Sequence, residues 1–165
     1  DLPAAVLVVQ HMPPGFTELF AERLDEECEL RVREAREGDP ISPGQVLIGP
    51  AGLHLEVAAH GSGGAVRLTK SSPRLGVRPS VDVMMCSAAK VYGSRTLGVI
   101  LTGMGKDGCE GVRAVKRENG MTIAEAESTC VVFGMPKAAI STGCIDRIVP
   151  LGDIPEAIVE MVAAM

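Results

Sequence analysis

Two short stretches of the sequence carry side chains that could act together in catalysis. "QHMPPGFT" begins at Gln10 and places His11 directly after an apolar run. "LTGMGKDG" begins at Leu101 and places Asp107 after another apolar run. In open α/β sheets, ligands bind beyond the carboxyl ends of the strands, where both residues are expected to lie. There an Asp could orient the imidazole of a His, and the His could take a proton from a hydroxyl.

Each of these residues also has a simpler interpretation. His11 could be a structural histidine of a loop. Asp107 could be a helix N-cap, whose carboxylate accepts hydrogen bonds from the free N–H groups of the next helix. Ser80, in "RPSVDV", is expected to be an N-cap of the same kind. The residue types alone leave both roles open for His11 and Asp107.

The glycines of the second stretch favour a different class of site. Gly103, Gly105 and Gly108 have the spacing of the GxGxxG turn, which opens a helix in dinucleotide-binding domains. Asp107 argues against this alternative, because a pyrophosphate would bind at the same helix N-terminus. At about 4 Å and an effective dielectric near 20, the two charges would repel by about 4 kcal/mol.

The elements that must position these residues alternate along the chain. Short apolar or alternating runs predict strands at 5–10, 30–36, 44–50, 53–60, 65–71, 97–103, 121–126 and 144–150. Helices are expected at 17–28, 79–91, 108–119, 135–142 and from 153 onwards, with Thr17, Ser80 and Asp153 as caps. This order predicts an α/β fold: a three-layer, mostly parallel, doubly wound sheet with helices on both faces. A glycine-rich turn between 53–60 and 65–71 predicts an antiparallel edge hairpin.

Composition limits the classes of protein that the chain can represent. Its 165 residues are 46% hydrophobic with a net charge of −5, which is typical of one globular domain, here residues 1–165. An acidic chain is a poor partner for nucleic acid, whose phosphates require clustered Lys and Arg. No apolar run approaches the roughly 20 residues of a membrane span, so membrane insertion is not expected. His54 and His60 are expected at the surface or at a sheet edge.

The cysteines indicate reduced thiols in a cytoplasmic protein. They are odd in number, widely spaced and without a CxxC pair: Cys28, Cys86, Cys109, Cys130 and Cys144. This pattern favours neither a disulfide framework nor a zinc site. Small buried residues are the expected role, and Cys130 is the alternative as a nucleophile.

Four motifs together resemble one enzyme family. "QHMPPGFT", "RPSVDV", "LTGMGKDG" and "CVVFGMP" occur in this order and resemble the catalytic domain of the chemotaxis protein-glutamate methylesterases, the CheB family. The resemblance spans nearly the whole chain. It implies hydrolysis of glutamate γ-methyl esters on the cytoplasmic region of methyl-accepting chemoreceptors, with release of methanol and possible deamidation of receptor glutamines. It implies no metal and no other cofactor.

The resemblance also assigns roles to individual residues. It implies a Ser-His-Asp triad in which His11 is the base and Asp107 orients it. Met104, Met12 and Ser80 are expected to line the substrate cleft, and the Met104 N–H is the candidate donor of an oxyanion hole.

The sequence departs from the family's pattern at the nucleophile. The family carries its serine in a GxSTGG-type motif before the QHM strand, and no such motif occurs in residues 1 to 165. The serine and a regulatory receiver domain are therefore expected upstream of Asp1, and residues 1–165 alone are expected to be inactive. The alternative is a non-catalytic module of the same fold that binds receptors or a regulator.

Overall fold

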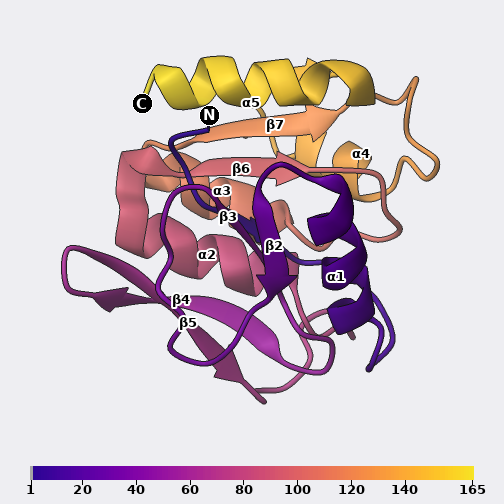
Figure 1. Ribbon diagram of the computed structural model, residues 1–165. Coiled ribbons are helices and arrows are strands. Elements are labelled where there is room, and N and C mark those ends of the chain that lie inside the picture. Colours follow the sequence, from indigo (N-terminus) through magenta and orange to yellow (C-terminus); the bar gives the residue numbers. More distant parts are fainter. Residues whose placement is uncertain (1) are drawn as a thin grey trace.

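Strands and helices alternate along the chain, as Figure 1 shows for the computed structural model, which describes residues 2–165. The strands are β1 Val6–Val8, β2 Arg31–Glu34, β3 Gln45–Ile48, β4 His54–His60, β5 Gly63–Thr69, β6 Leu97–Ile100, β7 Met121–Glu125 and β8 Arg147–Val149. The α-helices are α1 Thr17–Glu27, α2 Val81–Tyr92, α3 Cys109–Arg117, α4 Met135–Ile140 and α5 Ile154–Ala163. Each predicted element is present. The strands are shorter than the runs that predicted them, except β5, which has the same length and begins two residues earlier.

Six of the strands form two parallel sheets. One sheet has the order β1-β3-β2 and the other the order β6-β7-β8. β4 and β5 pair antiparallel from His54 opposite Thr69 to His60 opposite Gly63, and they form a separate two-stranded sheet. The predicted α/β fold with mostly parallel strands and an antiparallel hairpin is confirmed. The predicted edge position of the hairpin is wrong, because β4 and β5 pair with neither parallel sheet in the part of the chain that the structure describes.

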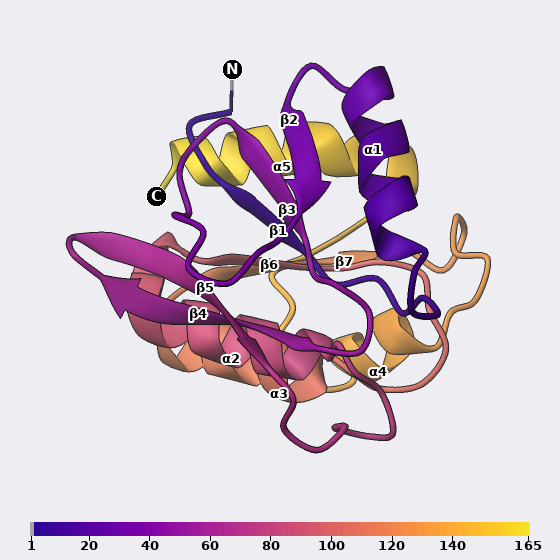
Figure 2. The same ribbon diagram turned by 60° about the horizontal axis from the view of Figure 1, so that its bottom comes forward.

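Helices cover both faces of the parallel sheets, because the strands are apolar on both sides. α5 lies on one face of β6 and β7, where Ile154, Ala157 and Met161 pack with Ile123. α2 and α3 lie on the other face, and the hairpin of β4 and β5 lies beyond α2 (Figure 2).

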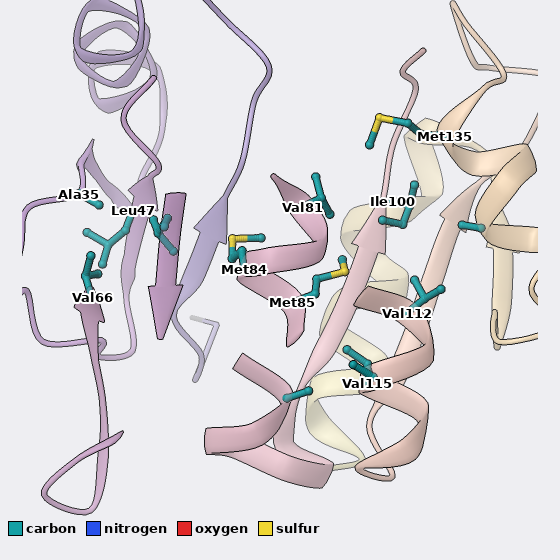
Figure 3. Packing of buried hydrophobic residues seen from close by; sticks show 14 residues of the cluster. Ala35, Leu47, Val66, Val81, Met84, Met85, Ile100, Val112, Val115 and Met135 are labelled. Atoms are coloured by element: carbon teal, nitrogen blue, oxygen red, sulfur yellow. The ribbon is translucent and has the colours of Figure 1, made fainter. Parts of the chain in front are cut away.

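The main core fills the space between the strands and these two helices (Figure 3). Leu47, Leu55, Ile100, Val112 and Val115 are its largest fully buried side chains, each 1% exposed or less. Close packing of this kind makes each side chain sensitive to a change of one methylene group. None of the helices in residues 2–165 is long and apolar enough to cross a membrane.

Two of the predicted helix caps are wrong. Phe16, not Thr17, is the N-cap of α1, and the Thr17 hydroxyl donates to Glu34 and accepts from the Ala51 N–H at 3.1 Å. Asp153 is the N-cap of α5, but its side chain makes no capping hydrogen bond. Thr17 contacts distant segments instead of capping its helix, and a local cap motif cannot reveal such contacts.

The two predicted surface histidines differ in burial. His60 is exposed at the end of β4, as predicted. His54 is fully buried, and the prediction of a surface position is wrong. Its Nε2 lies 3.2 Å from the carbonyl oxygen of Ser72, so the ring holds the segment after β5 against the start of β4.

Candidate active site

Asp107 is a buried carboxylate at the centre of a hydrogen-bond network. It lies between β6 and α3 and is 4% exposed. Its Oδ1 accepts hydrogen bonds from the Ser80 hydroxyl at 2.7 Å and from the N–H groups of Asp82 at 3.0 Å and Gly108 at 3.1 Å. Its Oδ2 accepts from the Val81 N–H at 2.7 Å. The carboxylate is therefore fixed in position by donors from two elements.

These hydrogen bonds keep Asp107 ionised in spite of its burial. Burial raises the pKa of the carboxyl, but hydrogen bonds from His11, from Ser80 and from the N–H groups of Asp82 and Val81 outweigh it. The net pKa of Asp107 lies below its ordinary value. A carboxylate in this state can accept a hydrogen bond from an imidazole and stabilise an imidazolium.

The N-termini of α2 and α3 are capped reciprocally. Asp107 precedes α3 and caps α2. Asp82 lies in the first turn of α2 and caps α3, because its Oδ1 accepts from the Gly108 N–H at 2.9 Å and from the Gly111 N–H at 2.8 Å. This exchange explains how the Asp107 carboxylate comes to point towards α2, away from its own helix.

Asp82 also overturns the dinucleotide alternative. A pyrophosphate would bind to the free N–H groups at the start of α3. The buried carboxylate of Asp82 already occupies the N–H groups of Gly108 and Gly111. The carbonyl oxygen of Gly103 is bonded to the start of α4. The glycines shape a tight turn and do not cradle a phosphate, and Gly105 and Gly108 both have a positive φ.

His11 completes the site from the loop after β1. Its Nε2 lies 3.0 Å from Asp107 Oδ2, although the two residues are 96 positions apart in the sequence. The side chain of His11 is 28% exposed. Because an ionised carboxylate only accepts hydrogen bonds, the neutral ring carries its proton on Nε2, and Nδ1 is an acceptor. Within residues 2–165 this Nδ1 has no hydrogen-bond donor, and it is free to receive a proton.

Ser80 contacts Asp107, but it acts neither as a helix cap nor as a nucleophile. It stands at the N-cap position of α2 without a capping hydrogen bond, so the predicted capping contact is wrong. Its fully buried hydroxyl donates to Asp107 and not to His11. Ser80 therefore helps to hold the Asp107 carboxylate in position.

Cys130 is not an activated nucleophile. Burial, followed by the charge of Glu125, raises the pKa of its thiol above the ordinary value. A nucleophilic cysteine needs the opposite shift, because the thiolate is the reactive form. All five cysteines are free thiols, as predicted. Cys28 is exposed and the others are partly exposed, so the expected full burial is wrong.

Of the three predicted cleft residues, Ser80 is fully buried and does not line an open cleft, contrary to the prediction. The other two, Met104 and Met12, lie on two loops. Met104 is at the tip of the turn after β6 and is 82% exposed. Its backbone N–H has no acceptor within the described part of the chain. Met12 is half-buried in the loop directly after His11. The contacts of the described residues do not connect Met12 to the pair of His11 and Asp107.

Two residues of the site were missed by the sequence analysis. Asp82 was counted only as part of a helix start, and Glu125 as the end of a strand. Glu125 is fully buried and accepts hydrogen bonds from the Thr102 N–H at 2.8 Å and from the Thr129 hydroxyl at 3.0 Å. A carboxylate inside the apolar run "MTIAEA" was the available signal for Glu125.

Comparisons with known proteins place the chain in one family. The family model described as CheB methylesterase matches residues 1–158. Proteins named protein-glutamate methylesterase/protein-glutamine glutaminase are 49% identical in Pyrococcus abyssi and 50% identical in Symbiobacterium thermophilum, each over 162 residues. These alignments cover 98% of this chain and 44% of each relative. The chain thus spans less than half the length of these relatives.

A solved structure supports the same relationship. The crystal structure of the Thermotoga maritima CheB methylesterase catalytic domain superposes with a TM-score of 0.95 at 49% sequence identity. The alignment covers 97% of this chain and 85% of that chain. The match of the family model to nearly the whole chain and the likeness of the fold show that the chain belongs to the CheB methylesterase family.

Proposed function

We propose that the protein containing this chain hydrolyses glutamate γ-methyl esters on chemoreceptors and also deamidates receptor glutamines. The observation that carries the proposal is the hydrogen bond between His11 and the buried, ionised Asp107, with Nδ1 of His11 free to accept a proton. The names of these relatives describe both reactions. Both reactions attack an acyl carbon, so one base and one oxyanion site serve for either.

The steps follow from the roles of the two residues. A serine Oγ attacks the γ-carbonyl carbon of the ester, and its proton passes to Nδ1 of His11. The tetrahedral intermediate expels the methoxy group, which takes the proton from His11 and leaves as methanol. Water then attacks the acyl-enzyme, and its proton passes through His11 to the serine oxygen. The products are a glutamate carboxylic acid, which ionises, and the free serine. With glutamine the first leaving group is ammonia.

The serine is proposed to come from outside residues 1–165, from a strand that joins β1 or β6. Each of these two strands has one paired neighbour within residues 2–165. The three residues of β1, Val6–Val8, are apolar yet only partly buried, as is typical of an edge whose neighbour is supplied elsewhere. The contact of His11 with Asp107 brings the carboxyl ends of β1 and β6 together. A turn after an added strand would present its serine there.

Met104 is proposed to stabilise the negative charge of the intermediate. Its exposed N–H lacks an acceptor, as an oxyanion-hole donor requires before substrate binds. Met12 and the Met104 side chain are proposed to contact the substrate around the ester. Ser80 is proposed as a support of Asp107.

The partner of the site is proposed to be the cytoplasmic region of a methyl-accepting chemoreceptor. A receiver domain in the full-length protein is proposed as a second partner, since the chain covers only 44% of its relatives. The free cysteines support action in the reducing cytoplasm.

Methanol release from methylated receptor membranes tests the proposal. The full-length protein should release methanol, and His11→Gln should lower the rate by several orders of magnitude, because no base remains. A His11→Gln variant that is as active as the wild type would refute the assignment. A folded wild-type protein that binds receptors without releasing methanol would indicate a binding module.

A further inference from the structure

Glu125 is a buried carboxylate without a counter-ion. It ends β7, is 0% exposed and forms no ion pair within residues 2–165. Burial of such a group is unfavourable unless hydrogen bonds compensate for the lost water. Its two oxygens accept from the Thr102 N–H and from the Thr129 hydroxyl. The Thr129 oxygen in turn accepts from the Leu151 N–H at 3.0 Å. Glu125 thus connects the segments that follow β6, β7 and β8.

Thr102 links Glu125 to a second set of hydrogen bonds. Its hydroxyl accepts from the Val132 N–H at 2.8 Å and donates to the Val132 carbonyl at 3.2 Å. The Gly103 N–H donates to the same carbonyl at 3.0 Å. The turn after β6 is therefore tied to the segment that leads into α4, and Glu125 holds the first residue of that turn.

The orientation of the next peptide group follows from the start of α4. The Gly103 carbonyl oxygen accepts from the Gly134 N–H at 3.1 Å and from the Met135 N–H at 2.7 Å. In a planar trans peptide the carbonyl and the N–H point in opposite directions. The Met104 N–H therefore points away from α4, and it has no acceptor within residues 2–165. A Cβ on Gly134 would lie 2.6 Å from the Gly103 oxygen, so only glycine permits this approach.

We infer that Glu125 is a positioning residue for the oxyanion-hole donor at Met104, acting through Thr102 and the fixed Gly103 carbonyl. The inference rests on the proposed function and names a residue that does not touch the substrate. It gives a reason for a buried carboxylate without an ion pair next to the turn after β6. A fixed donor stabilises the transition state more than the bound substrate. Displacement of the donor should therefore lower kcat and leave KM nearly unchanged.

Two substitutions of Glu125 in the full-length protein test the inference. Glu125→Ala removes the acceptor of the Thr102 N–H, and kcat for methanol release should fall about 10- to 100-fold with KM within about threefold. Loss of a whole oxyanion donor costs about 10²–10³, and displacement of one costs less. Glu125→Gln keeps an oxygen for Thr102 and can donate an N–H to Thr129. It should keep kcat within about threefold of the wild type. The pH at half-maximal rate should not move in either variant, because His11 is untouched.

A second pair of variants keeps the test decisive if Glu125→Ala does not fold. Thr102→Val removes the hydroxyl that bonds to Val132 and should lower kcat, whereas Thr102→Ser keeps the hydroxyl and should restore it. Thr122→Ala is the matched control for Glu125→Ala. Like Glu125, Thr122 is fully buried on β7, but its hydroxyl bonds to Cys144 and Asp146, away from the turn. This substitution should lower the melting temperature without lowering kcat.

The outcomes separate this inference from the proposed function. A wild-type protein that releases no methanol would overturn the proposed function, and this inference with it. An active wild type with unchanged kcat in Glu125→Ala and Thr102→Val would overturn only the inference. A loss of kcat in Thr122→Ala equal to that in Glu125→Ala would also overturn it, since the effect would then be general destabilisation.

Discussion

Replacement of Asp107 by Asn separates its catalytic role from its role as a cap. The two carboxylate oxygens accept five hydrogen bonds, and three of the donors are backbone N–H groups that cannot reverse their direction. Val81 N–H bonds to Oδ2, whereas the N–H groups of Asp82 and Gly108 bond to Oδ1. An amide has one acceptor oxygen, so its NH₂ must face at least one of these buried donors.

The expected losses can be estimated for stability and for catalysis. One buried donor left without a partner costs about 1–3 kcal/mol, and a lost charge-assisted hydrogen bond is of similar size. We expect Asp107→Asn to lower the free energy of unfolding by about 2–4 kcal/mol. In the serine-protease triad the equivalent substitution lowers turnover by about 10⁴, which corresponds to about 5.5 kcal/mol in the barrier. We expect a fall of similar size in kcat here.

Asp82→Asn is the matched control for this substitution. Asp82 is equally buried and caps α3 through Oδ1 alone, so an Asn can keep both capping bonds and loses only the contact of Oδ2 with the half-exposed Arg74. We would measure methanol release by the full-length variants at a temperature where circular dichroism shows both to be folded. A folded Asp107→Asn protein with kcat within about tenfold of the wild type would refute the triad assignment and leave Asp107 as a cap.

Four further predictions follow from the same contacts. Cys130→Ala in the full-length protein should keep the wild-type rate of methanol release, because the raised thiol pKa does not suit a nucleophile; a large loss would restore Cys130 as a candidate. Residues 1–165 alone should release no methanol above background even when folded, and activity equal to that of the full-length protein would place the nucleophile inside this chain. Gly111→Ala should lower the melting temperature, since the new Cβ would lie 2.7 Å from Met85 Cβ between α2 and α3, and an unchanged value would show that the helices can separate at no cost. Burial raises the pKa of Asp146 and of Asp107, but hydrogen bonds, which for Asp146 come from Lys116 and Thr122, outweigh it and leave both pKa values below the ordinary value. The stabilisation from these carboxylates is complete above about pH 5 and is lost as the pH falls through the unfolded-state value of about 4 towards the folded-state values. Asp146→Asn should therefore lose less stability than the wild type between about pH 5 and pH 3 in urea titrations.

The sequence predicted the pair of His11 and Asp107 because strand ends of a parallel sheet gather at one edge. Apolar or alternating runs of about six to eight residues predicted the strands, and their alternation with helices predicted the layers. The strand boundaries were less accurate, since 97–103 was expected to be a strand and β6 ends at Ile100. Leu101 to Gly103 leave the strand because Thr102 and Gly103 bond to Glu125 and Val132 instead.

Contacts between distant segments could not be predicted from local patterns. The side chains of Ser80 and Asp107 match N-cap preferences, yet Ser80 bonds to Asp107, and Asp107 caps α2, not the helix that follows it. The exchange of caps between Asp107 and Asp82 depends on the packing of α2 against α3, which a single sequence does not encode in any short motif. The same holds for the burial of His54, whose partner Ser72 lies in another segment.

Covalent labelling of the full-length protein with a fluorophosphonate tests the central claim most directly. The reagent phosphonylates a serine that a histidine activates, with loss of fluoride. We predict one labelled serine, located by peptide mapping outside residues 1–165, and a much slower labelling of the same serine in His11→Gln. Labelling of Ser80 or of another residue within 1–165, or labelling of His11→Gln at the wild-type rate, would contradict the claim that His11 and Asp107 activate a serine supplied by the rest of the protein.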